Sequence, residues 1–127
     1  MPTTPPAILV VDDEPQVRKV IRSVLEADGY IVTEAADGHA ALLLLSSVGG
    51  PRGPHLMVLD VMMPGIDGIE VCRQIDHGRT KVVILTALDD AATRTAAEEA
   101  GAERYLTKPF SAVELLDAVR ELLADAS

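Results

Sequence analysis

An apolar run that ends in a single carboxylate constrains the fold of this 127-residue chain more than any other stretch. Residues 56–59 carry no charge and lead directly into Asp60, and Pro64 and Gly65 follow shortly afterwards. Continuous apolar runs of this length are typical of strands that are buried on both faces, as in a parallel sheet. A carboxylate at the end of such a strand is costly unless another group compensates its charge. The sequence should therefore contain groups that compensate the charge of Asp60.

The rest of the chain alternates between short apolar runs and amphipathic segments. Strands are predicted at 7–11, 30–35, 56–59, 81–85 and 104–107, and helices are predicted to begin near Pro15, Asp37, Asp67, Asp89 and Ser111. Residues 49–54, which are rich in Gly and Pro, predict a loop. Five strands alternating with five helices predict an α/β fold, in which a parallel sheet has helices on both faces. We expect residues 1–6 to form a disordered leader and residues 7–125 to form one domain.

Composition argues against several kinds of partner. The formal net charge of −9 argues against direct nucleic-acid binding and against anionic membrane surfaces. No apolar run approaches the roughly 20 residues of a membrane span, and the N-terminus lacks the features of a signal peptide, so we expect a cytoplasmic protein. The lone Cys72 predicts a buried thiol without a disulfide. His39, His55 and His77 show no metal-ligand spacing and are expected at the surface.

Polar side chains follow four of the five predicted strands. They are Asp12 and Asp13, Asp60, Thr86 and Lys108. Parallel strands bring their carboxyl ends to one edge of the sheet, where open α/β sheets bind ligands. Clustered carboxylates repel unless a cation joins them, and an oxygen-only ligand set with retained water suits Mg²⁺. A magnesium ion, a lysine and a hydroxyl together predict a phosphoryl site, with Asp60 as the candidate nucleophile.

Each of these residues also has a purely structural interpretation. Asp13 could be the N-cap of the first helix, and Asp60 could be a turn former. Thr86 could simply end a strand, and Lys108 could be a solvated lysine before a proline. Their conjunction, each at its own strand end, is what favours a functional site.

Four sequence blocks carry a resemblance to a known family. They are VVDDEP at 10–15, LDVMMPGIDG at 59–68, ILTA at 84–87 and GAERYLTKPF at 101–110. In this order, over residues 8–123, they resemble the receiver domain of the two-component response-regulator family, of the chemotaxis-receiver type. The resemblance implies a flavodoxin-like three-layer sandwich with strand order 2-1-3-4-5. Right-handed crossovers would put the first and last helices on one face and the middle three on the other.

The resemblance also implies a role for each matching residue. Asp60 would be the phosphoacceptor of a phosphorelay. Asp13 and Asp60 would bind Mg²⁺ together with the backbone carbonyl of Met62, and Asp12 would act mainly through water. Lys108 would pair with Asp60 before phosphorylation and with the phosphoryl oxygens afterwards.

A second group of matching residues is implied to sense the phosphoryl group. The Thr86 hydroxyl would move onto it, helped by the Ala87 N–H. Tyr105 would be the switch aromatic that turns inward when Thr86 moves, unless it is a plain structural tyrosine. The Lys108–Pro109 peptide is implied to be cis, which fits the reduced trans preference before proline.

Three functional hypotheses follow from these observations. The leading one is a phosphorylation-dependent signalling switch, which catalyses only its own phosphorylation and dephosphorylation. Its implied phosphoryl donor is a sensor histidine kinase or a phosphotransfer protein. A downstream effector or output domain would bind the face formed by the fourth helix, fifth strand and fifth helix. A second copy of the chain in a phosphorylation-linked homodimer is a further implied partner. The second is a Mg²⁺-dependent aspartyl-phosphate phosphohydrolase, although the adjacent Asp12 and Asp13 depart from the haloacid-dehalogenase spacing. The third is a receiver-like docking module that is not phosphorylated.

Overall fold

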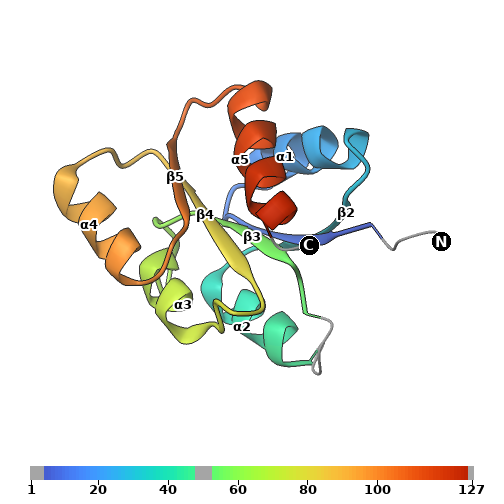
Figure 1. The fold of residues 1–127 in the computed structure, drawn as a ribbon. Coiled ribbons are helices and arrows are strands. Elements are labelled where there is room, and N and C mark those ends of the chain that lie inside the picture. The colour runs from blue at the N-terminus through green and yellow to red at the C-terminus, as the bar shows by residue number, and fades with distance from the viewer. Residues whose placement is uncertain (1–4, 48–52, 126–127) are drawn as a thin grey trace.

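The computed structural model describes residues 5–47 and 53–125. Within them, five strands alternate with five helices, as the sequence predicts (Figure 1). Residues 1–4 of the expected leader and 49–52 of the predicted loop lie outside the described residues. The elements in chain order are β1 (Ala7–Val11), α1 (Pro15–Ala27), β2 (Ile31–Ala35), α2 (Gly38–Ser47), β3 (Leu56–Leu59), α3 (Gly68–Gln74), β4 (Lys81–Thr86), α4 (Ala91–Glu99), β5 (Arg104–Thr107) and α5 (Ala112–Asp125).

The five strands form one parallel sheet in the order β2-β1-β3-β4-β5, which confirms the implied topology. All four residues of β3 are buried, because this strand has a neighbour on each side and helices on both faces. The edge strand β2 instead has exposed side chains at Ile31 and Thr33 and buried ones at Val32 and Ala35. The apolar run before Asp60 therefore occupies the centre of the sheet.

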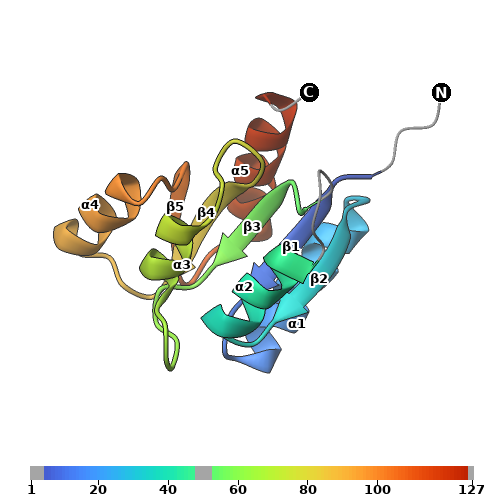
Figure 2. The same ribbon diagram turned by 90° about the horizontal axis from the view of Figure 1, so that it is seen from below.

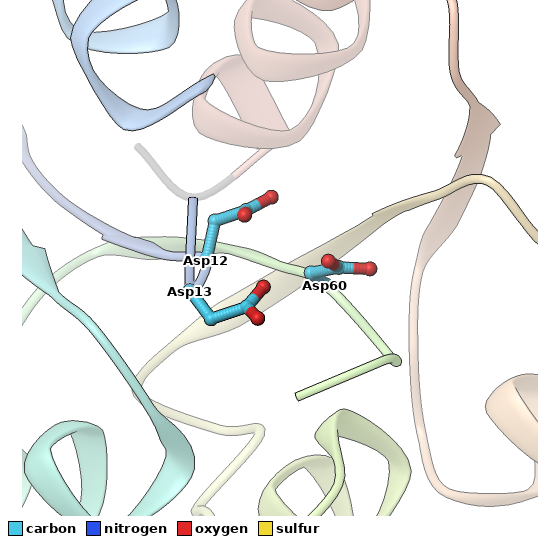
Figure 3. Close-up of side chains that lie close together, drawn as sticks. All are labelled: Asp12, Asp13 and Asp60. Carbon is cyan, nitrogen blue, oxygen red and sulfur yellow. The ribbon is translucent and has the colours of Figure 1, made fainter. Parts of the chain in front are cut away.

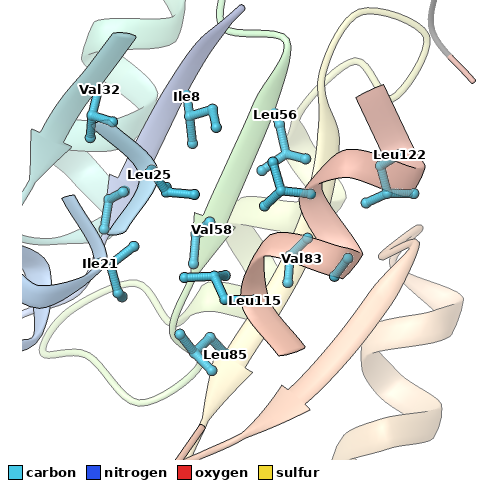
Figure 4. Close-up of a cluster of buried hydrophobic side chains, with 13 residues drawn as sticks. Ile8, Ile21, Leu25, Val32, Leu56, Val58, Val83, Leu85, Leu115 and Leu122 are labelled. Atoms are coloured by element: carbon cyan, nitrogen blue, oxygen red, sulfur yellow. The ribbon is translucent and has the colours of Figure 1, made fainter. Parts of the chain in front are cut away.

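Helices cover both faces of the sheet. Helices α1 and α5 lie on one face and α2, α3 and α4 lie on the other, as right-handed crossovers predict (Figures 1 and 2). Figure 4 shows the core under α1 and α5, where aliphatic side chains of both helices meet those of the sheet. Each fully buried aliphatic side chain in such a core contributes about 1.5–3 kcal/mol relative to an exposed one. No helix among the described residues is both long enough and apolar enough to cross a bilayer.

Side-chain caps begin several helices where the sequence predicts them. Ser111 and Glu114 form a reciprocal capping box at α5, in which each backbone N–H donates to the other side chain at 3.0 and 3.2 Å. At α3 only half of such a capping box forms. The Asp67 carboxylate accepts from the Glu70 N–H at 2.9 Å, whereas the Glu70 carboxylate bonds to side chains of its own helix.

The cysteine and histidine predictions hold except at one position. Cys72 is fully buried, and burial raises the pKa of its thiol to about 12. His39 and His55 are exposed. His77 is only partly at the surface, with 25% of its side chain exposed: its Nε2 lies 2.7 Å from the Cys72 carbonyl oxygen, and a Cβ on Gly101 would come within 2.7 Å of its ring. Helix α3 ends at Gln74, and the turn that follows folds the imidazole back against the end of α4.

Gly68 lets the backbone of α3 approach the end of β3 directly. It is the buried first residue of α3, and its N–H donates to the Val61 carbonyl at 3.0 Å. A Cβ at this position would lie 2.0 Å from the carbonyl oxygen of Asp60. The position of Asp60 is therefore tied to a glycine eight residues further along the chain.

We expect Gly68→Ala to lower the free energy of unfolding by about 1–3 kcal/mol, because the added methyl group must displace backbone rather than a flexible side chain. Urea denaturation followed by circular dichroism measures this difference. Gly53→Ala is the matched control, since the nearest atom to its Cβ is the end of the Arg79 side chain at 3.7 Å. Equal stability of the two variants would contradict the close approach at Gly68.

Candidate functional site

Three carboxylates meet at the carboxyl edge of the sheet. Asp12 and Asp13 follow β1, and Asp60 follows β3, which pairs with β1. One oxygen from each of the three lies within 4.8 Å of the others, and Figure 3 shows the side chains reaching into one region. Asp12 and Asp60 are 2% and 4% exposed, whereas Asp13 is open to solvent. The predicted convergence of these residues at one edge is thus present.

Lys108 brings a positive charge to this cluster from the end of β5. Its Nζ donates to Asp12 Oδ2 at 2.8 Å and to Asp60 Oδ2 at 3.3 Å. The pairing implied by the sequence resemblance was with Asp60, and the structure adds a shorter contact with Asp12. The Lys108 N–H donates to the Thr86 carbonyl at 2.8 Å, and the Lys108–Pro109 peptide is cis.

The pKa values in the cluster reflect burial first and the neighbouring charges second. Burial raises the pKa of Asp60 and the nearby Asp12 charge adds to this, although Lys108, the Thr86 hydroxyl and the Met62 N–H oppose it. For Lys108, burial alone would lower the pKa, but its hydrogen bonds and charge interactions with Asp12 and Asp60 outweigh burial and raise it. One lysine therefore faces three carboxylates, two of them buried. An additional cation would relieve their repulsion.

The surroundings of the cluster suit a small, hard cation. Asp12, Asp13 and Asp60 offer only oxygen ligands, and exposed Asp13 leaves room for water on one side. An open depression of about 460 Å³ adjoins this side and is lined by Asp13, Val61, Met62, Met63, Pro64 and Asp67. Few carboxylates combined with access for water fit the coordination that Mg²⁺ prefers. Another depression, of about 410 Å³, lies between α2 and the end of α3 and shares no residue with the cluster.

Thr86 and Met62 flank Asp60 from two directions. Thr86 is fully buried at the end of β4, and its hydroxyl hydrogen bonds with Asp60, which lowers the pKa of that carboxyl. Met62 is 56% exposed, and its N–H donates to Asp60 Oδ1 at 3.3 Å. Ala87 follows β4 and is exposed. Both oxygens of Asp60 thus have donors before any ligand is present.

Tyr105 lies beside the loop that leads from β4 to α4 rather than among the carboxylates. Its hydroxyl donates to the Leu88 carbonyl at 2.5 Å, and the Leu88 N–H lies 3.4 Å from Thr86 Oγ1. The Arg94 guanidinium of α4 covers the Tyr105 ring at 4.5 Å from its centre. Burial raises the pKa of Tyr105. These contacts connect Thr86 through Leu88 and Tyr105 to α4.

Sequence reasoning missed one contact with the acidic cluster. The Arg18 guanidinium, on α1, donates to the backbone carbonyl of Asp12 at 2.7 Å and to Glu34 Oε1 of β2 at 2.9 Å. The signal in the sequence was weak, because Arg18 and Arg22 are spaced like ordinary exposed charges on an amphipathic helix. Only the pairing of β1 with β2 places Glu34 beside them.

Comparison with known proteins assigns the chain to a family. The model of the response regulator receiver domain matches residues 8–120. Among curated proteins, the transcriptional regulatory protein ResD of Bacillus subtilis is 44% identical over 121 residues, which are 94% of this chain and 49% of ResD. The response regulator MprA of Mycolicibacterium vanbaalenii is 46% identical over 121 residues, which are 94% of this chain and 51% of MprA. The chain spans about half the length of these relatives.

Solved structures agree with this assignment. The receiver domain of the Francisella response regulator 1452 is 34% identical with a TM-score of 0.85, and the match covers 96% of this chain and 99% of that one. The response regulator TrrA of Thermotoga maritima, in complex with Mg²⁺-BeF, is 35% identical with a TM-score of 0.79, and the match covers 92% and 98% of the two chains. Because sequence, strand order and acidic pocket all agree over nearly its whole length, the chain belongs to the family of response regulator receiver domains.

Proposed function

We propose that residues 7–125 act as a phosphorylation-dependent switch in which Asp60 accepts a phosphoryl group from a sensor histidine kinase or a phosphotransfer protein. The observation that carries this proposal is the meeting of three carboxylates with Lys108 at one sheet edge. A carboxylate oxygen of Asp60 attacks the phosphorus, and the phosphoryl group leaves its histidine donor. Lys108, 3.3 Å from Asp60, supplies a fixed positive charge for the phosphoryl oxygens.

Asp12, Asp13 and Asp60 would hold Mg²⁺, together with the backbone carbonyl of Met62. The close approach of the three carboxylate oxygens, with one lysine beside them, supports this assignment. TrrA, a relative of similar fold, was solved with Mg²⁺-BeF. When bound, the ion would neutralise charge on the carboxylates and on the incoming phosphoryl oxygens. Buried Asp12 would act mainly through water, while exposed Asp13 would contact the ion directly.

The phosphoryl group would be sensed by Thr86, with the Ala87 N–H as a second donor. The Leu88 N–H lies 3.4 Å from Thr86 Oγ1, and movement of the Thr86 hydroxyl toward the phosphoryl group would break this contact. Leu88 also holds the Tyr105 hydroxyl, so that Tyr105 would be freed to turn inward. Helix α4 has one buried residue, Ala97, within its described range, and such light packing lowers the cost of moving it.

The face formed by α4, β5 and α5 would carry the signal outward. Its reader would be a downstream effector, an output domain or a second copy of this chain in a phosphorylation-linked homodimer. The length of ResD and MprA beyond the matched half supports an output domain on the same polypeptide. The chemistry we propose for the domain itself is limited to gain and loss of the phosphoryl group on Asp60.

Acetyl phosphate with MgCl₂ is expected to add one phosphoryl group to the wild-type protein and none to Asp60→Asn, because the amide is no nucleophile. Intact mass spectrometry measures the product. Asp117→Asn, the same change at an exposed position on α5, is the matched control and should label like the wild type. Undiminished labelling of Asp60→Asn would refute the proposed phosphoacceptor.

In EDTA at neutral pH, Asp60→Asn is expected to be more stable than the wild type. The raised pKa of Asp60 means that the folded protein holds this proton more tightly than the unfolded chain does. Ionised Asp60 therefore costs stability above its folded pKa, and the cost vanishes below the ordinary carboxyl pKa of about 4. Urea denaturation of both proteins across this pH range measures the difference, which should shrink as the pH falls. Lower stability of Asp60→Asn than of the wild type at neutral pH would contradict this cost of the buried Asp60 charge.

Thr86→Val keeps the shape of the side chain and removes the hydroxyl, so we expect phosphorylation to persist while α4 no longer responds to it. Hydrogen–deuterium exchange over residues 88–99, with and without acetyl phosphate, measures the response. Thr107→Val, on the neighbouring strand β5, is the control and should respond like the wild type. An unchanged response of α4 in Thr86→Val would exclude the proposed role of the hydroxyl.

A further inference from the structure

We infer that Arg18 is a positioning residue of the cation site, which fixes the peptide between Asp12 and Asp13 and so aims both carboxylates. The inference rests on the proposed binding of Mg²⁺ by these residues. Its basis is the contact of 2.7 Å from Arg18 Nη1 to the carbonyl oxygen of Asp12. Arg18 touches no carboxylate of the site in this contact. It acts on the backbone that carries two of them.

The oxygen that Arg18 holds belongs to the peptide group that joins Asp12 to Asp13. This group is planar, so holding its oxygen also fixes the direction of the Asp13 N–H and Cα. The Asp12 N–H donates to the Ala35 carbonyl of β2 at 3.2 Å, and Asp12 Oδ1 accepts from the Glu14 N–H at 2.9 Å. With these contacts in place, the Arg18 bond fixes the orientation of the peptide that leads to exposed Asp13. Asp13 itself is exposed, so the orientation of its carboxylate depends on this backbone contact.

Glu34 on the edge strand holds Arg18 in place. Arg18 Nε donates to Glu34 Oε1, and Arg22 Nη1 donates to Glu34 Oε2, both at 2.9 Å. The Arg18 side chain is 16% exposed and that of Glu34 is 28% exposed, so that this network is partly shielded from solvent. Hydrogen bonds from both arginines, that of Arg22 foremost, lower the pKa of Glu34 and keep it charged. The planar guanidinium can donate hydrogen bonds to the Asp12 carbonyl and to the Glu34 carboxylate at once. A lysine ammonium group is less suited to this double contact.

Charge and positioning predict opposite effects of removing Arg18. A cation close to a Mg²⁺ site repels the ion, so loss of its charge alone would strengthen Mg²⁺ binding. Loss of a group that orients the ligands weakens binding, and partners that orient metal ligands typically contribute about 10- to 100-fold in affinity. The sign of the change therefore separates the two roles.

Titration of the ¹⁵N-labelled protein with MgCl₂, followed through the amide signals of Asp13 and Met62, tests the inference. For Arg18→Met we expect Mg²⁺ affinity to fall by about tenfold, the lower end for such orienting groups. Arg18→Lys keeps the charge and one donor and should recover part of the loss. Arg22→Met is the matched control: it removes the same charge from the same carboxylate partner without touching Asp12, so affinity should stay at the wild-type value.

Dispersed amide spectra and cooperative thermal unfolding show that each variant is folded at the titration temperature. If Arg18→Met is unfolded, Glu34→Gln takes its place, because it loosens the guanidinium while leaving Arg18 present; it should lower affinity in the same direction. Binding by Arg18→Met as tight as or tighter than that of the wild type would overturn the positioning role and leave the proposed function intact. An equal loss in Arg22→Met would assign the effect to the charge of Glu34 and also overturn it. Failure of the wild type to bind Mg²⁺ would overturn both this inference and the proposed cation site.

Discussion

The position of Lys108 between Asp12 and Asp60 is the interaction on which the arrangement at the sheet edge depends. Both carboxylates are almost fully buried, and a buried charge without a partner costs several kcal/mol. Lys108 lies 96 residues from Asp12 in the sequence, so these groups meet only when β1, β3, β4 and β5 are assembled. One lysine beside three carboxylates still leaves an excess of negative charge, and burial raises the pKa of Asp60. The fold thus holds Asp60 in a state that favours the arrival of further positive charge.

The strand order places the residues that orient the carboxylates and those expected to sense modification on opposite sides of the sheet. The carboxylates follow β1 and β3, which are neighbours at its centre. The groups expected to sense modification, Thr86 and Tyr105, belong to β4 and β5 on one side. Arg18 and Glu34 hold the acidic turn from the other side, through α1 and β2. Contacts from α1 and β2 can therefore orient the carboxylates at the centre of the sheet. A change at these carboxylates can be transmitted on the other side to α4, which is lightly packed.

The sequence could predict those features that depend on pattern along the chain. Apolar runs located the strands, and the polar residues after them located Asp60, Thr86 and Lys108 at one edge. The shorter contact of Lys108 with Asp12 could not be predicted, because it depends on how side chains from strands far apart in sequence pack together. Arg18 was missed for a related reason: on α1 it resembles an ordinary surface charge until β2 pairs with β1. His77 is less exposed than the sequence predicts because the turn after α3 brings its ring against Gly101.

A crystal structure of the protein grown with Mg²⁺ and beryllofluoride would test the central claim most directly. The account predicts a beryllofluoride group on the carboxylate of Asp60, with Mg²⁺ beside Asp13, Lys108 turned toward the fluorines and the Thr86 hydroxyl drawn to the same group. Density for the two ligands elsewhere, or an unmodified Asp60 with Lys108 still bound to Asp12, would contradict it.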